Sequence, residues 1–138
     1  MLQVPDAAET VMPLRSDVDV LKARQCGKQL AAALHFSNSE RTIIATAISE
    51  IARNTVLYAQ SGHMRLKLIQ QGARRGMLIV TEDKGPGIAD LDLAMQDGYT
   101  TSRGLGIGLP GAKRLMDEFD IVSEVGKGTT ITMKKWER

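Results

Sequence analysis

The sequence is poor in cysteine, with Cys26 alone among 138 residues. A lone cysteine cannot form a disulfide within the chain, and such usage is typical of a reducing compartment. No stretch approaches the roughly twenty apolar residues of a membrane-spanning helix. The first ten residues, MLQVPDAAET, lack the basic and apolar regions of a signal peptide. We therefore expect a cytoplasmic protein with no membrane span.

The sequence also lacks an excess of one charge. Eighteen basic residues stand against sixteen acidic ones, and aromatic residues make up only 4% of the chain. Short basic pairs are scattered and have few aromatic residues beside them, which argues against nucleic-acid binding. Apolar residues at 43% and charged residues at 25% are ordinary for a globular protein, and the length favours one domain.

The periodicity of the sequence predicts an α+β fold, a two-layer sandwich with a mostly antiparallel sheet and helices on one face. Residues 1–14 show no clear period and read as a loose leader. Ser37 and Glu40 have the spacing of a capping box before a long helix. The core stripe expected on that helix comprises Ile44, Ala47, Ile48, Ile51, Thr55 and Tyr58. The other expected elements are strands at 17–21, 63–69, 77–81, 121–125 and 129–136, and helices at 22–34, 90–96 and 109–118.

Glycine is concentrated in one stretch, since seven of the thirteen glycines fall between Thr81 and Gly111. A first cluster, Asp83-Lys84-Gly85-Pro86-Gly87, follows an apolar strand, so a carboxylate is expected at the end of that strand. A second cluster, residues 104–110, leads into a helix and carries Pro110, a residue favoured in the first helical turn. Glycine lets backbone amides approach an anion, and a helix start favours phosphate, so this cluster predicts a phosphate-binding loop.

Two common nucleotide motifs are excluded. The stretch does not contain Gly-x-Gly-x-x-Gly in a first strand-to-helix turn, as a dinucleotide-binding domain would. It does not contain the Gly-Lys-Ser/Thr of a P-loop either. A glycine repeat by itself fits an unstructured loop equally well, so the order of the surrounding elements has to carry the interpretation.

The predicted long helix carries Glu50 and Asn54, four residues apart and therefore on one face, at the border of the core stripe. Taken alone, this pair fits a solvated glutamate and a polar edge residue better than it fits a site. The glycine clusters downstream change that interpretation.

Four boxes occur in the order Glu50-x-x-x-Asn54, Asp83-x-Gly85-x-Gly87, Gly104-Leu105-Gly106-Ile107-Gly108 and Gly128-Thr129-Thr130. With them the chain resembles the GHKL superfamily of ATPases and kinases, whose ATP-binding domain has the Bergerat fold. The resemblance covers residues 17–136 and implies a single ATP-binding kinase domain over residues 15–138.

Within that superfamily the segments AISEIARNTVLYA and GKGTTI, and the glycine-rich stretch between them, are similar to the RsbT-like serine/threonine switch kinases of bacterial partner switching and stressosome signalling. This resemblance implies an ATP-dependent kinase that phosphorylates a serine or threonine on STAS-domain antagonist proteins. It also implies a downstream effector, such as a PP2C-type phosphatase, and the cofactors ATP and Mg²⁺.

The resemblance also implies roles for single residues. Asp83 matches the carboxylate that accepts from the adenine amino group, and Thr129 or Thr130 matches the residue that holds adenine through water. Asn54 matches the Mg²⁺ ligand, and Glu50 matches the general base. The remaining positions are Gly85 and Gly87 beside the base, Gly104, Leu105, Gly106, Ile107 and Gly108 at the phosphates, and Thr100, Thr101, Ser102 and Arg103 in the ATP lid of residues 97–103. Arg103 is the candidate contact to the γ-phosphate.

The chain departs from the superfamily pattern in ways that disfavour some classes of protein within the superfamily. The lid is short, which disfavours the anti-sigma-factor kinases with longer lids, and no phosphoacceptor helix precedes the fold, which disfavours a histidine kinase core. Tyr58 stands where some relatives have histidine. A protein kinase is the first reading. An anti-sigma factor or nucleotide-regulated binding module is the second, and a plain ATP hydrolase is the third.

Overall fold

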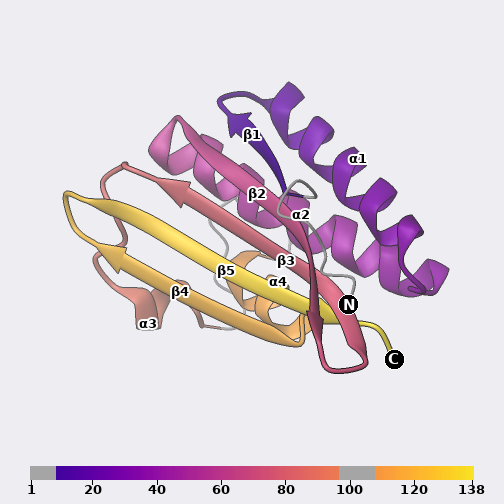
Figure 1. Cartoon of the computed structure of the whole chain (residues 1–138). Coiled ribbons are helices and arrows are strands. Elements are labelled where there is room, and N and C mark those ends of the chain that lie inside the picture. Colours follow the sequence, from indigo (N-terminus) through magenta and orange to yellow (C-terminus); the bar gives the residue numbers. More distant parts are fainter. Residues whose placement is uncertain (1–8, 97–107) are drawn as a thin grey trace.

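The computed structural model describes residues 9–96 and 108–138. The described part forms one antiparallel sheet with helices on one of its faces (Figure 1), as the sequence predicts. The strands are β1 (Thr10–Leu14), β2 (Gly62–Gln71), β3 (Arg74–Asp83), β4 (Glu118–Glu124) and β5 (Gly128–Trp136), in the sheet order β1-β2-β3-β5-β4. The helices are α1 (Asp17–Ala33), α2 (Asn38–Ala59), α3 (Leu91–Ala94) and α4 (Gly108–Leu115).

The core lies between the sheet and α2. Alternate residues of the central strands face the helices, so Met77 and Ile79 of β3 and Met133 of β5 are fully buried. Ile48 and Ile51 of α2 pack against this surface and are also fully buried. Apolar side chains that repeat every 2.0 residues in the strands and every 3.6 in the helix therefore pack together in one apolar layer.

The start of α2 confirms the predicted capping box. The Glu40 N–H donates to Ser37 Oγ at 3.1 Å, and the Ser37 N–H donates to Glu40 Oε1 at 3.0 Å. Helix α1 crosses α2 closely at Gly27, where an added Cβ would lie 2.2 Å from Ile48 Cδ1. The two helices therefore pack closely as a hairpin, with α2 over the sheet.

Two expectations near the N-terminus are wrong. Residues 10–14, taken as part of a loose leader, form the edge strand β1, which pairs with β2. Residues 17–21, taken as a strand, begin α1 instead. Asp17 and Asp19 occupy the first turn of this helix, where acidic side chains are favoured, and Val20 and Ala23 are buried at helical spacing. Pro13 is tolerated in β1 because the strand is at the sheet edge.

The C-terminal half of the chain differs from prediction mainly at element ends. Helix α4 ends at Leu115, and Glu118 already belongs to β4. The predicted hairpin is confirmed with longer strands, β2 and β3, joined by a two-residue turn whose Gly72 has φ +62°. Tyr58, expected in the core stripe, is 49% exposed because the last turn of α2 borders a cavity there.

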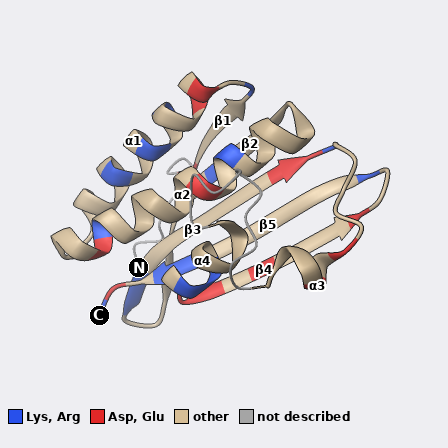
Figure 2. Cartoon of the chain, turned by 180° about the vertical axis from the view of Figure 1, so that it is seen from behind, with Lys and Arg blue, Asp and Glu red and all other residues tan. Residues whose placement is uncertain are grey.

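Charges of both signs occur over the helical side of the molecule (Figure 2), in keeping with the net charge of +2. Within residues 9–96 and 108–138, no helix is both long enough and apolar enough to cross a membrane.

Candidate functional site

A cavity of about 240 Å³ lies where the C-terminal half of α2, the end of β3, helix α3 and the start of β5 meet. Three of the four predicted boxes contribute residues to its wall: Asn54 from the first, Asp83 and Gly87 from the second, and Thr129 from the last. Tyr58 of α2 and Leu93 of α3 line it as well. Positions up to 75 residues apart in the sequence therefore converge on one concave surface, where small-molecule sites are commonly found.

Asp83 is the last residue of β3, as expected, and its carboxylate is fixed by two backbone donors. Its Oδ1 accepts from the Gly85 N–H at 2.9 Å and from the Thr129 N–H at 3.2 Å. Both hydrogen bonds go to the same oxygen, so Oδ2 can accept from a donor in the cavity. A carboxylate accepts hydrogen bonds without donating any, so this residue type suits an amino donor.

Three glycines allow the chain to close around Asp83. An added Cβ at Gly85 would lie 2.6 Å from Ala59 Cβ, and one at Gly87, whose φ is +77°, would lie 2.3 Å from the Glu124 carbonyl oxygen. At Gly128, with φ +125°, the added Cβ would lie 2.0 Å from the Asp83 carbonyl oxygen. Close packing within the protein therefore requires glycine at these three positions, whether or not a nucleotide is bound.

The two threonines that the sequence could not separate lie on opposite faces of the sheet. Thr129 is buried, lines the cavity and donates its N–H to Asp83. Thr130 pairs with Glu82 in the β3–β5 ladder and faces the uncovered side of the sheet. Of the two predicted adenine contacts, Thr129 is therefore the one that lines this cavity.

Ser123 is a supporting residue that the sequence reasoning missed. Its Oγ accepts from the Ile88 N–H at 2.7 Å and shares a hydrogen bond of 2.8 Å with Thr129 Oγ1. The signal that would have found it is the strand register, because Ser123 pairs directly with Thr129 across β4 and β5. Ser123 therefore links the turn after Asp83 to the strand that carries Thr129.

Glu50 and Asn54 are more buried than their position at the edge of the core stripe suggests, with exposed fractions of 8% and 7%. Asn54 lines the cavity. The Glu50 carboxylate is engaged elsewhere: its Oε1 accepts from the Gly108 N–H at 2.7 Å, and its Oε2 forms an ion pair with Arg53. Gly108 is the first residue of α4 and has φ +68°.

Several predicted site residues lie outside the described part of the chain. These are Thr100, Thr101, Ser102, Arg103, Gly104, Leu105, Gly106 and Ile107, together with the rest of the predicted lid. Their roles at the phosphates stay predictions. Gly108 and Pro110 belong to the first turn of α4.

The donor set fits Mg²⁺ held mainly by a nucleotide. The described residues contain no group of three or more His, Cys, Asp and Glu side chains placed to hold a metal. Mg²⁺ is usually bound through one or two protein oxygens plus substrate phosphates and water, and the Asn54 amide oxygen at the cavity wall is a hard ligand of this kind.

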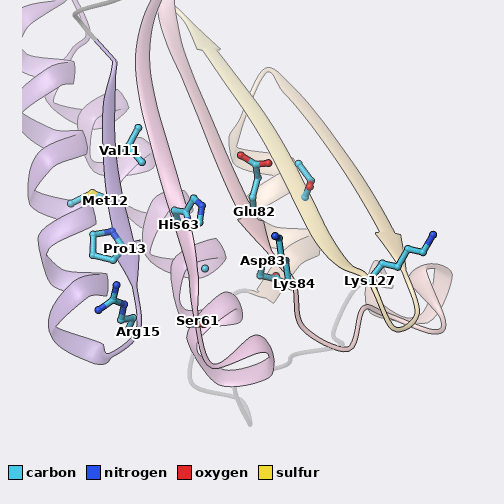
Figure 3. Close-up of a pocket in the computed structure, with 12 residues that line it drawn as sticks. Val11, Met12, Pro13, Arg15, Ser61, His63, Glu82, Asp83, Lys84 and Lys127 are labelled. Atoms are coloured by element: carbon cyan, nitrogen blue, oxygen red, sulfur yellow. The ribbon is translucent and has the colours of Figure 1, made fainter.

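A second, larger cavity of about 750 Å³ opens on the other side of the sheet (Figure 3). Val11 and Pro13 of β1, His63 of β2 and Glu82 of β3 lie along it. Asp83 borders both cavities, but Glu82 is already ion-paired with Arg65 at 3.1 Å, and neither Asn54 nor Thr129 lines the larger one. Size alone therefore does not identify the site, and the smaller cavity holds the converging polar groups.

Comparisons with known proteins identify the family of the chain. The family model described as histidine kinase-like ATPase domain matches residues 13–135. The chain is 44% identical to serine/threonine-protein kinase RsbT of Bacillus subtilis, over 94% of this chain and 98% of that protein. It is 33% identical to an anti-sigma F factor of Geobacillus thermodenitrificans, over 82% of this chain and 81% of that protein.

A solved structure adds evidence on the fold. The RsbU and RsbW domains of a Mycobacterium tuberculosis protein superpose with a TM-score of 0.64 at 21% identity, covering 92% of this chain and 31% of that one. The Bergerat-type arrangement expected from the four sequence boxes is thus found in both the family match and the fold comparison.

Proposed function

This chain belongs to the histidine kinase-like ATPase family, and from that membership we propose that it is an ATP-dependent serine/threonine protein kinase of bacterial partner switching. The observation that carries the proposal is the meeting of Asp83, Thr129 and Asn54 around one cavity in a chain that matches a serine/threonine kinase over nearly its whole length. ATP is the nucleotide we assign to this cavity.

In the proposed reaction, Asp83 accepts from the adenine amino group, and the Thr129 hydroxyl supports adenine through water. Asn54 helps to hold Mg²⁺, which when bound neutralises charge on the phosphates. The hydroxyl oxygen of the partner's serine or threonine attacks the γ-phosphorus, the bond from that phosphorus to the β–γ bridging oxygen breaks, and ADP leaves. Glu50 receives the hydroxyl proton. Residues 100–108, with Arg103 at the γ-phosphate, complete the proposed phosphate site.

We assign the substrate to the STAS-domain class of antagonist proteins and the downstream effector to the PP2C-type phosphatases. Support comes from the near-complete match to RsbT, a match that includes the segments flanking the cavity. The proposal makes residues 15–138 one kinase domain, extended at its start by β1, and places the protein in the cytoplasm.

The second candidate is an anti-sigma factor or nucleotide-regulated binding module. It is favoured by the 33% identity to anti-sigma F factors and by the engagement of both Glu50 oxygens within the protein. The two candidates differ in whether phosphate leaves the nucleotide for another protein.

A transfer assay separates them. Purified protein is incubated with γ-labelled ATP, Mg²⁺ and purified STAS-domain proteins encoded by the same genome, and the products are analysed by mass spectrometry. The kinase proposal predicts label on a serine or threonine of a STAS-domain protein, lost with Asp83→Asn. ATP binding without any labelled protein supports the binding module, and phosphate released only to water supports a plain hydrolase.

A further inference from the structure

Arg53 lies on α2 between the two residues of the predicted Glu50-x-x-x-Asn54 box. Its guanidinium Nη1 forms an ion pair with Oε2 of Glu50, three residues earlier. The Arg53 side chain is 35% exposed, whereas that of Glu50 is 6% exposed. The guanidinium therefore reaches inward from the surface and covers a carboxylate that is otherwise buried.

The other Glu50 oxygen has a different partner. Oε1 accepts from the backbone N–H of Gly108, at 2.7 Å, at the first residue of α4. The first N–H groups of a helix have no partner within the helix, and the helix dipole favours an anion at that end. With one oxygen on Arg53 and the other on α4, both the position and the plane of the carboxylate are fixed.

This double contact matters because burying a charged side chain is costly unless it is paired and hydrogen-bonded. A general base must be ionised and aimed at the proton it receives. Removal of Arg53 would leave the buried Glu50 carboxylate with the Gly108 N–H as its donor, and the carboxylate could then rotate away from Gly108. Lysine would restore the charge at position 53 but not the planar donor geometry of the guanidinium.

We propose that Arg53 is a positioning residue for phosphoryl transfer: its ion pair holds the Glu50 carboxylate turned toward the start of α4. This inference rests on the proposed kinase function, because it takes Glu50 as the group that receives the hydroxyl proton. Arg53 acts through Glu50 and touches neither ATP nor the partner protein in this account.

The kinetic test compares Arg53→Met, Arg53→Lys and Glu50→Gln with the double variant Arg53→Met/Glu50→Gln. Single-turnover transfer from Mg²⁺-ATP to a purified STAS-domain protein gives the rate constant, and calorimetry gives ATP affinity. Arg53→Met should slow transfer by about ten- to a hundredfold, part of the usual contribution of a base, and leave ATP affinity nearly unchanged. Arg53→Lys should recover most of the loss. Arg24→Met, at an exposed position of α1, is the matched control and should match wild type.

The double variant shows whether Arg53 works through Glu50. Once Glu50→Gln has removed the base, adding Arg53→Met should change the remaining rate by less than about twofold, since coupled residues are not additive. An equal loss in both backgrounds would show that Arg53 acts independently and would overturn the inference. So would a wild-type rate for Arg53→Met.

A readout without turnover keeps the test separate from the kinase proposal. Hydrogen exchange of the Gly108 amide, followed by NMR, should accelerate in Arg53→Met and stay slow in Arg53→Lys and Arg24→Met. Unchanged protection in Arg53→Met would overturn the inference even if the protein is a kinase. If wild-type protein labels no STAS-domain protein, the kinase function fails, and the Gly108 signal still decides whether Arg53 orients Glu50.

Discussion

At the scale of single residues, Asp83 is the most specific feature of the site. The sequence was sufficient to predict it, because an apolar run followed by Asp-x-Gly-x-Gly puts a carboxylate at a strand end. Ser123 and Arg53 could not be predicted in the same way. Ser123 depends on the β4–β5 register, and Arg53 depends on how the helix presents Glu50 to α4.

Replacing Asp83 with asparagine should weaken ATP binding. An amide is a weaker acceptor and can present a donor to the adenine amino group, at a cost of about 1–3 kcal/mol or more, which is about five- to 150-fold in affinity. Calorimetry measures the change. Asp120→Asn, on the exposed part of β4, is the control that should bind as wild type does. Wild-type affinity in Asp83→Asn would remove this residue from the adenine site.

Ser123→Ala should destabilise the fold around the cavity. The Ile88 N–H and the Thr129 hydroxyl lose a shared partner, which costs about 1 kcal/mol, and more if the amide stays unsatisfied. Urea unfolding measures this loss. Ser39→Ala, at an exposed position of α2, should change stability little. Equal effects of the two variants would contradict the linking role of Ser123.

At the scale of elements, the sequence predicted those with strong local signals. Helix α2 has both a capping box and a long periodic stripe, and the β2–β3 hairpin has alternating strands joined at a glycine. The start of α1 was misassigned because Asp17 to Val20 is too short to distinguish a period of 2 from one of 3.6. Strand β1 was missed because residues 10–14 show no clear period. Tyr58 fits the stripe by spacing, but spacing does not reveal that a cavity replaces the sheet beside it.

A prediction at this scale concerns Gly87, in the turn after β3. Its control is Gly126, in the turn that the Gly87 turn contacts. Gly87 and Gly126 both have positive φ, +77° and +81°, but an added Cβ meets the Glu124 carbonyl oxygen only at Gly87. Gly126→Ala should cost about 1–2 kcal/mol for the left-handed backbone alone. Gly87→Ala should cost clearly more, because the chain must also shift. Equal unfolding free energies in urea would show that the close approach at Gly87 is not required.

At the scale of the whole molecule, the C-terminal residues tie separate parts of the fold together. Arg75 donates to both Glu137 carboxylate oxygens, at 3.2 and 3.1 Å, and the His35 N–H between α1 and α2 donates to the same carboxylate. Nearby, Asp117 accepts from the Trp136 N–H at 2.8 Å. Both contacts join segments far apart in the sequence, which local patterns cannot predict.

These contacts predict a dependence of stability on pH. Burial raises the pKa of Glu137, but the His35 N–H and Arg75 outweigh it and lower the pKa below its ordinary value of 4.5. The stabilisation is therefore present above that value and is lost as pH falls through the lower pKa of the folded state. Glu137→Gln should be less stable than wild type at pH 7, with a difference that shrinks below about pH 4.5.

Urea unfolding at several pH values measures this difference. Glu124→Gln is the matched control, because its carboxylate is 67% exposed and pairs with Lys127 at the surface, at 3.4 Å. Surface pairs of this kind contribute little, so the control should track wild type at every pH. A Glu137→Gln difference that stays constant down to pH 3 would contradict the assigned role of the carboxylate.

The central claim is that this fold transfers phosphate to another protein with Glu50 as the base. The most direct measurement is the single-turnover rate of labelling of a purified STAS-domain protein by Glu50→Ala, alongside its affinity for Mg²⁺-ATP. We predict nearly unchanged affinity and a rate lower by about a hundred- to ten-thousandfold, with the lower end favoured because loose phosphoryl transition states need less help from a base. Normal ATP binding with labelling within about threefold of wild type, below that range, would contradict the claim.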